Sequence, residues 1–238
     1  MGMRSSTELE HRIAGIAALD QPLRRDLYRL LSDRDGWTTR DEASEALGVA
    51  RSVAAFHLDK LAEAGVVEVR FERTNGRTGP GAGRPSKLYR PSDDEVSASV
   101  PERRYDLAGS LLATAVAEAS GTGATVADCL SATAHAAGRQ IGEESRDAAT
   151  SLEPSEDRRH AVLEVLARHG YQPETGEHNE ITLANCPFHR LAEEHRTLVC
   201  GMNLDFLRGL LEGVDPTDRL AARLAPEPGY CCVRIAAA

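Results

Sequence analysis

Apolar residues in the N-terminal third recur at helical spacing in three short runs. The first, Pro22–Leu31, is a leucine stripe. The second begins at Thr39, which stands three residues before Glu42 as in a capping box. The third, Arg51–Ala64, follows Gly48, which fits a tight turn. Three helices with a short glycine turn before the last one predict a helix-turn-helix.

The third run has an apolar set and a polar set. Its apolar character comes from Val53, Phe56, Leu58 and Leu61. Its exposed residues near the start are expected to be Arg51, Ser52, Ala55 and His57. Such a helix lies in the major groove of DNA, where Arg51 can contact either a guanine or a phosphate. We take these four residues, with Thr39, as candidate DNA contacts.

After Gly65 the apolar period shortens to two. Val66–Phe71 and Lys87–Arg90 alternate as strands do, and residues 73–86 between them are rich in Gly, Pro and Arg. This pattern predicts a β-hairpin, the wing of a winged helix. Its cations are Arg70, Arg73, Arg77, Arg84, Lys87 and Arg90. A basic hairpin can follow the phosphate backbone or enter the minor groove, so Arg73, Arg77, Arg84 and Lys87 join the candidate contacts.

The C-terminal half reads as helices followed by short strands. We expect helices at 105–120, 125–144, 155–169 and 197–212, and strands at 171–174, 180–184 and 230–235, the last pairing near 220–224. The predicted fold class is therefore α+β. It comprises a winged helix-turn-helix at 1–91, a linker at 92–104, and a helical dimerisation and sensor domain with a small antiparallel sheet at 105–238.

Charge separates the two halves. Residues 1–92 hold 15 Arg or Lys against 13 Asp or Glu, whereas residues 93–238 hold 13 against 24. The acidic half is expected to point away from DNA. No apolar run approaches the roughly 20 residues of a membrane span, and the N-terminus lacks a secretory pattern. We therefore expect a cytoplasmic protein that has no membrane partner and whose cysteines are reduced thiols or ligands rather than disulfides.

Cysteine and histidine gather near the C-terminus. They are Cys186, His189, His195, Cys200, Cys231 and Cys232. Thiolate and imidazole suit iron–sulfur clusters and zinc. Cys186, Cys200 and Cys231 belong to three different elements that could converge on one ion or cluster. Cys232 is expected to face away from Cys231 because neighbours alternate in a strand, and Cys129 to be a core residue.

Two other functions remain open. An enzyme could pair Cys186 with His189, but no third orienting group is evident, and His189 and His195 lack the spacing of a zinc protease. We therefore do not expect catalysis. A metal-free redox sensor could instead form a disulfide between Cys200 and Cys231 or Cys232.

Residues 48–61 and 64–67, with Gly83-Arg84-Pro85 before Leu88-Tyr89, resemble the winged helix-turn-helix of ArsR- and DeoR-like bacterial regulators. The resemblance implies a homodimer on double-stranded DNA that carries a palindromic operator. The helices between the two motif regions would then supply the dimer interface.

The stretches 185–189, 194–195, 199–200 and 231–235 resemble SufR-like regulators, in which a winged helix is joined to an iron–sulfur site. This resemblance implies that Cys186, Cys200 and Cys231 are ligands of an iron–sulfur cluster, with His189 as candidate fourth ligand and zinc as the alternative. The chain departs from that pattern by one extra residue between the first two cysteines and by Cys-Cys in place of Cys-aromatic.

Overall fold

The computed structural model describes residues 3–72, 85–148, 156–176, 180–217 and 220–238. The chain forms two compact units, one spanning Ser6–Ala98 and the other built mainly from Ser99–Ala238. Each unit has its own sheet and its own apolar core. Helices and small antiparallel sheets make up both, which confirms the predicted α+β class.

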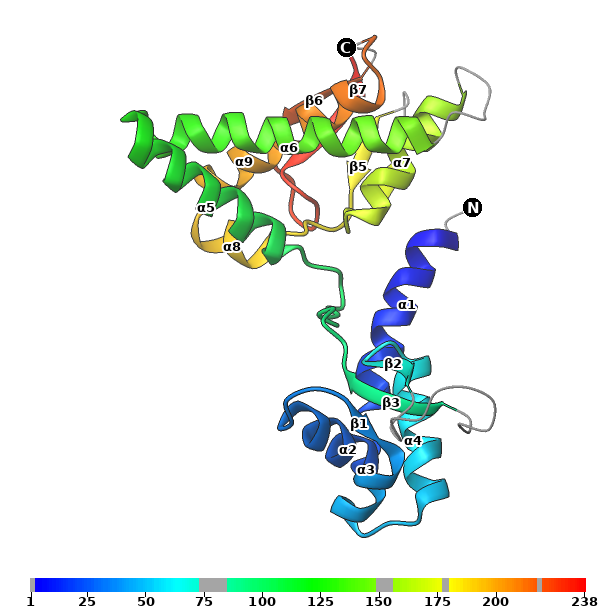
Figure 1. Ribbon diagram of the computed structural model, residues 1–238. Coiled ribbons are helices and arrows are strands. Elements are labelled where there is room, and N and C mark those ends of the chain that lie inside the picture. The colour runs from blue at the N-terminus through cyan, green and yellow to red at the C-terminus, as the bar shows by residue number, and fades with distance from the viewer. Residues whose placement is uncertain (1–2, 73–84, 149–155, 177–179, 218–219) are drawn as a thin grey trace. The chain divides into compact units, whose positions relative to one another are not determined.

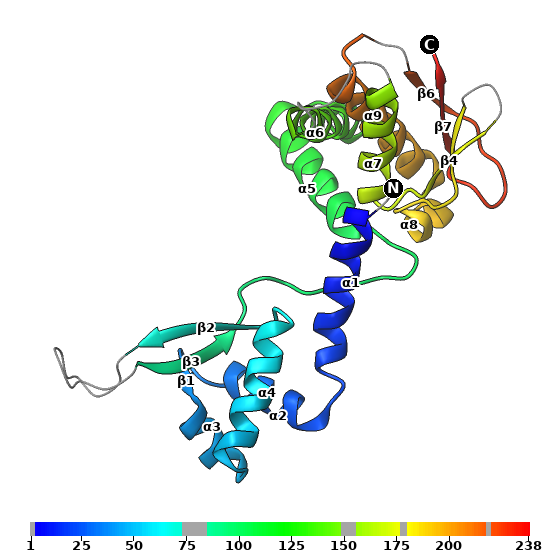
Figure 2. The same cartoon turned by 90° about the vertical axis from the view of Figure 1, so that its right-hand side faces the viewer.

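The N-terminal unit contains the three predicted helices and the two predicted strands, together with a further helix before them and a short strand after the first predicted helix (Figure 2). The elements are α1 (Met3–Ala18), α2 (Pro22–Ser32), β1 (Thr38–Thr39), α3 (Arg40–Leu47), α4 (Arg51–Glu63), β2 (Val67–Glu72) and β3 (Ser86–Pro91). Strands β2 and β3 pair antiparallel, with Val69 opposite Tyr89. The two-residue strand β1, which is too short to leave a sequence pattern, adds to the other edge of β3.

The turn between α3 and α4 is fixed by local chemistry. The capping box is confirmed, because the Thr39 hydroxyl accepts from the Glu42 amide while the Glu42 carboxylate accepts from the Thr39 amide. At the other end Gly48 takes φ 63°, a left-handed conformation that glycine adopts without strain. Ser44 Oγ then donates to the carbonyl oxygen of Val49 at 2.7 Å and holds the turn closed.

The prediction that Ala55 and His57 are exposed was wrong, because both are partly buried. The helix buries Ala54, Leu58 and Leu61, which follow one another at helical spacing. Val53 and Phe56 lie off that face and are 39% and 58% exposed. The third run therefore has two apolar faces, and only the packing against α2 and β2 decides which one is buried.

The C-terminal unit combines helices with a small sheet (Figure 1). Its elements are α5 (Tyr105–Thr122), α6 (Val126–Ala148), α7 (Glu156–Arg168), β4 (Pro173–Thr175), β5 (Ile181–Leu183), α8 (His189–Glu194), α9 (Arg196–Val214), β6 (Leu220–Leu224) and β7 (Val233–Ala237). The strands form one antiparallel sheet in the order β4-β5-β7-β6. None of the described helices is long and apolar enough to cross a bilayer.

Helices α6 and α9 pack with their backbones in close approach. Four glycines lie at the contact, Gly138 and Gly142 on α6 and Gly209 and Gly213 on α9. A Cβ at Gly209 would overlap the carbonyl oxygen of His135, and one at Gly138 would overlap that of Phe206. Most residues of α9 are consequently buried.

The last strand begins later than predicted. It starts at Val233, not Tyr230, because the chain before it closes a turn in which the Tyr230 amide donates to the carbonyl oxygen of Glu227. Cys231 and Cys232 therefore belong to the loop between β6 and β7. The Cys231 amide is anchored to the carbonyl oxygen of Leu183 on β5 at 2.8 Å.

Candidate functional site

The exposed face of α4 combines polar and apolar side chains. Arg51 and Ser52 at its start are exposed, as predicted, and Val53 and Phe56 share that exposure. Ala55 and His57 are partly buried, and the His57 ring meets the Phe56 ring edge-on at 5.2 Å. An exposed aromatic side chain on such a helix can contact a thymine methyl group. The apolar periodicity of the sequence did not show that Phe56 is exposed in the folded domain.

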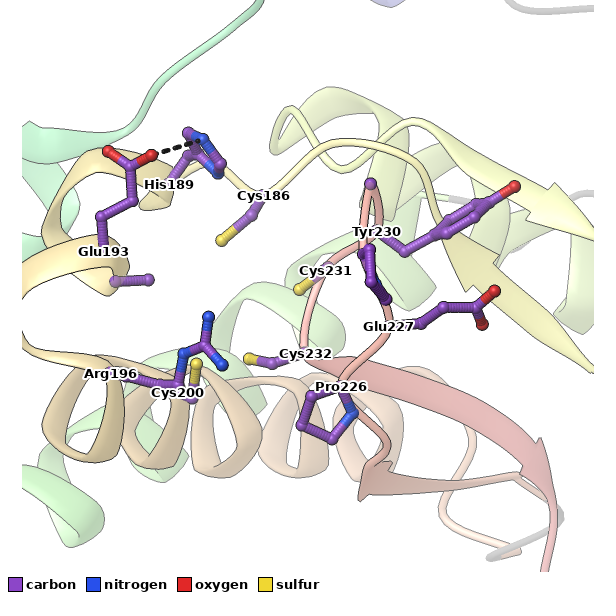
Figure 3. A pocket seen from close by; sticks show the side chains of 13 residues that line it. Cys186, His189, Glu193, Arg196, Cys200, Pro226, Glu227, Tyr230, Cys231 and Cys232 are labelled. Atoms are coloured by element: carbon purple, nitrogen blue, oxygen red, sulfur yellow. Dashed lines mark ion pairs between the residues drawn. The ribbon is translucent and has the colours of Figure 1, made fainter.

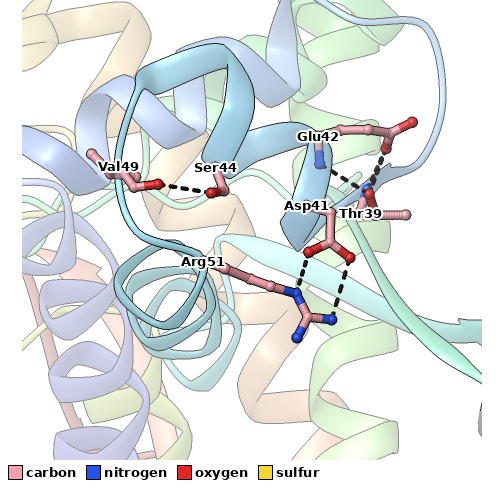
Figure 4. Close-up of polar contacts among 6 residues, drawn as sticks. All are labelled: Thr39, Asp41, Glu42, Ser44, Val49 and Arg51. Carbon is pink, nitrogen blue, oxygen red and sulfur yellow. Dashed lines mark hydrogen bonds and ion pairs between the residues drawn. The ribbon is translucent and has the colours of Figure 1, made fainter.

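Arg51 does not stand free at the start of α4. Its Nε and Nη2 both face the carboxylate of Asp41 on α3, with Nη2 3.3 Å from Oδ2 (Figure 4). Both side chains are 61% exposed, so the pair lies on the surface. The sequence analysis did not single out Asp41, which is ten residues away along the chain.

Two other predicted DNA contacts have structural partners. The Thr39 hydroxyl donates to Glu42 Oε2 at 2.9 Å as part of the cap. Lys87 Nζ lies 2.5 Å from Asp59 Oδ1, which also accepts from the buried Tyr89 hydroxyl at 2.8 Å. Burial opposes ionisation of Asp59, but the hydrogen bonds from Lys87 and Tyr89 outweigh it and lower its pKa. This cluster ties the hairpin to α4.

In the described part of the hairpin, Arg70 and Arg90 are each paired with acidic residues. Arg70 pairs with Glu72 at 2.6 Å, and Arg90 pairs with both Glu68 and Asp93. The same two guanidiniums lie over the Trp37 ring, at 4.5 and 4.9 Å from its centroid. The predicted contacts Arg73, Arg77 and Arg84 lie outside the described residues.

The second site is a pocket of about 340 Å³ in the C-terminal unit. Four cysteines line it: Cys186, Cys200, Cys231 and Cys232. They come from three segments, namely the turn after β5, the second turn of α9 and the loop before β7. Figure 3 shows the four sulfur atoms turned toward one space. The structure thus brings together the three cysteines that the sequence analysis grouped and adds Cys232.

The inclusion of Cys232 corrects the expectation that it faces away from Cys231. Strand alternation does not apply, because both residues precede β7. His189 also lines the pocket, but its Nε2 is 3.3 Å from Glu193 Oε1 and the side chain is 56% exposed. Cys129, as expected, packs in the helical core.

The four thiols form a row of contacts, in which Cys186 touches Cys231, Cys231 touches Cys232, and Cys232 touches Cys200. A hydrogen bond with the Cys231 thiol lowers the pKa of Cys186. A second hydrogen bond, between the thiols of Cys231 and Cys232, lowers the pKa of Cys232 to about 6. The pKa of Cys231 is raised by its contacts with Cys186 and Cys232, and burial raises that of Cys200 to about 12. Lowered and raised pKa values therefore alternate along this row of four thiols.

A buried amide side chain is hydrogen-bonded to one of the cysteines of this pocket. Asn203, one turn after Cys200 on α9, is 1% exposed. Its Nδ2 donates to Cys231 Sγ at 3.2 Å, and its Oδ1 accepts from the fully buried Tyr171 hydroxyl at 2.5 Å. The sequence analysis missed Asn203, although a polar residue three positions after Cys200 on an apolar helix was an available signal.

The first cysteine segment is also bound to the end of the linker. Arg103 donates through Nη1 to Asn185 Oδ1 and to the Cys186 carbonyl oxygen, the latter at 3.2 Å. The buried Asn185 returns a hydrogen bond to the Glu102 carbonyl oxygen at 2.9 Å. Arg104 adds a backbone bond to Pro187. Residues 102–104 are therefore fastened to the turn that carries Cys186.

A family model described as a helix-turn-helix domain matches residues 19–70. The matched segment runs from the residues before α2 into β2 and includes the Asp41–Arg51 pair. A comparison with curated proteins found no match to the chain. The N-terminal unit is therefore a DNA-binding helix-turn-helix domain, as found in transcriptional regulators.

Proposed function

We propose that this transcriptional regulator is a homodimeric repressor of the SufR-like kind, which binds a palindromic operator according to the state of an iron–sulfur cluster held in its thiol pocket. The observation that carries the proposal is the convergence of four thiols from three chain segments on one pocket. Four thiolates are the usual ligand set of such clusters.

The arrangement of the donors favours a cluster over a single zinc ion. The four sulfurs line a pocket of about 340 Å³, which has room for a group larger than a single ion. Structural zinc takes four ligands around one centre, whereas a cluster distributes its ligands over several irons.

Cys186, Cys200, Cys231 and Cys232 are the residues that would hold the cluster. We assign Cys232 in place of His189, because the imidazole is paired with Glu193 while the Cys232 sulfur lies among the other three. Asn203 supports the Cys231 sulfur by a hydrogen bond, and such bonds tune cluster potentials. The cluster would supply a redox-sensitive and oxygen-sensitive centre.

The linker contact offers a route from the pocket to the DNA-binding unit. A displacement of Cys186 on filling or emptying of the pocket changes the position of the Asn185–Pro187 turn. Arg103 and Asn185 transmit that change to residues 102–104, which continue into the linker. His169 strengthens the attachment, since burial and the nearby Arg104 hold its pKa at about 4 and its neutral ring lies 3.3 Å from Arg104 Nη1.

The homodimer is supported by the symmetry of helix-turn-helix recognition, in which two recognition helices read two half-sites. Exposed apolar residues on α5 and α6, among them Val116 at 50% and Val126 at 42%, provide a surface that a second copy can cover. Light scattering of the purified protein measures the mass directly, and a monomer at every concentration contradicts this part of the proposal.

The cluster is tested by anaerobic purification, with an absorption spectrum and iron, sulfide and zinc analysis of one sample. We expect a brown protein with stoichiometric iron and acid-labile sulfide. Cys186→Ser and Cys232→Ser are expected to lose most of the iron, while His189→Ala and the matched control Cys129→Ser retain it. Binding to DNA without the cluster is expected to survive in all four variants.

Each contrary outcome assigns the pocket differently. A colourless protein with stoichiometric zinc makes the site a zinc site. A metal-free protein that gains a disulfide on oxidation makes it a thiol redox switch. Full iron in Cys232→Ser together with loss in His189→Ala restores the histidine as the fourth ligand.

A further inference from the structure

We propose that Asp41 is a specificity-determining positioning residue, which holds Arg51 side-on so that the free end of its guanidinium reads a guanine in the major groove. The inference concerns the DNA-binding unit alone and does not depend on what the thiol pocket binds. It chooses between the two roles, guanine or phosphate contact, that the sequence left open for Arg51.

The geometry of the pair carries the choice. A guanidinium has two edges that can donate two parallel hydrogen bonds, the Nε–Nη2 side and the Nη1–Nη2 end. Asp41 occupies the side, through both of its carboxylate oxygens. Figure 4 shows the third nitrogen directed away from the carboxylate. The end of the fork, which matches the O6 and N7 acceptors of guanine, is therefore presented outward without breaking the pair.

Electrostatics argue against the phosphate role. An arginine attracts DNA phosphates through its net charge, but Asp41 cancels that charge at the same spot. A phosphate brought to Arg51 would approach the Asp41 carboxylate as well. A guanine edge is neutral, so it meets no such repulsion.

The backbone makes the positioning rigid. Asp41 stands in the first turn of α3, whose start is fixed by the capping box. Arg51 is the first residue of α4, after the turn held by Gly48 and the Ser44–Val49 hydrogen bond. Fixing a long side chain before binding removes part of the entropy cost of ordering it at the DNA surface.

The test uses the full-length protein and a library of DNA duplexes with a randomised central segment. The motif selected by the wild type is expected to contain a guanine whose replacement by adenine weakens binding by roughly five- to 150-fold, the range for a bidentate contact. Arg51→Lys keeps the charge but lacks the fork, so it is expected to lose the preference at that position alone.

Asp41→Asn separates positioning from charge. It is expected to weaken the guanine preference several-fold while affinity for an unrelated duplex stays equal or rises, because a negative charge has been removed. Asp26→Asn is the matched control, since it removes a comparably exposed acid from the Arg29 ion pair on α2. It is expected to leave the selected motif unchanged.

Three results overturn the proposal. One is a motif with no guanine that depends on Arg51. Another is an unchanged guanine preference in Arg51→Lys. The third is a uniform loss of affinity across sequences in Arg51→Ala, with the salt dependence reduced by about one ion, which marks a phosphate contact. These three results concern the guanine contact of Arg51. The role of Asp41 is overturned separately if a folded Asp41→Asn protein keeps the full guanine preference of the wild type.

Discussion

The two units place their candidate functional residues in opposite ways. In the N-terminal unit four of the candidate contacts lie close together in sequence on α4, and the first of them, Arg51, pairs with Asp41 at the surface, where both side chains are 61% exposed. In the C-terminal unit the four thiols lie on segments up to 46 positions apart and are supported by buried groups such as Asn203. Substitutions can therefore separate function from stability in the first unit, whereas in the second they affect both.

The largest effect is expected at the contact between α6 and α9. Gly209→Ala places a methyl group against the His135 carbonyl oxygen, and overpacking of this kind costs about 3 kcal/mol or more when backbone must move. Unfolding followed by circular dichroism is expected to show a destabilised C-terminal unit. Trp37, the single tryptophan, reports the N-terminal unit and is expected to keep its fluorescence transition.

Gly201→Ala on the same helix is the matched control, since a Cβ there has open space. It is expected to be neutral, or stabilising by up to about 1 kcal/mol through helix propensity. A Gly209→Ala protein as stable as the wild type contradicts the close packing. If the Trp37 fluorescence transition shifts together with the circular dichroism transition, the two units do not unfold separately.

A smaller effect is expected where the pocket meets the linker. Arg103→Met removes the donor to Asn185 and to the Cys186 carbonyl oxygen. The proposed cluster is expected to remain, while the ratio of operator affinities with and without it falls toward one. A tenfold ratio corresponds to only about 1.4 kcal/mol, an amount that loss of one charged hydrogen bond can remove.

Titration of operator DNA with the anaerobic and the cluster-free protein measures this ratio. Arg139→Met, which breaks an exposed ion pair with Glu143 on α6, serves as control. An unchanged ratio in Arg103→Met shows that the signal takes another route.

The smallest effect is expected at Asp59, which joins α4 to the hairpin. Its pKa is lower in the folded protein than in the unfolded chain. The stability that it contributes is thus present above the ordinary aspartate value of about 3.9 and is lost as pH falls through the lower folded value. Because the side chain is 44% exposed, the contribution is modest.

Trp37 fluorescence can follow thermal unfolding of the wild type and of Asp59→Asn at several pH values, which measures the stability that Asp59 contributes. The difference in Tm is expected to be present at neutral pH and to shrink in acid. A difference that grows as the pH falls contradicts the assigned sign.

Sequence reasoning succeeded where neighbours along the chain decide the outcome. The capping box at Thr39 and Glu42 and the glycine turn at Gly48 are local features, and both are confirmed. It did not decide which apolar residues of α4 are buried, since Val53 and Phe56 are as apolar as Leu58 but are exposed. Apolar character predicts that some face is buried, and contact with the rest of the unit decides which face.

By itself the sequence determined the α+β class, the helix-turn-helix and the grouping of Cys186, Cys200 and Cys231, because capping, periodicity and residue chemistry are readable along the chain. Only the tertiary structure decided that Cys232 joins them, that Asn203 supports Cys231 and that Asp41 occupies one edge of Arg51. These relations depend on where a strand begins and how helices are set against one another. Such distances are fixed by packing between segments that are remote in sequence.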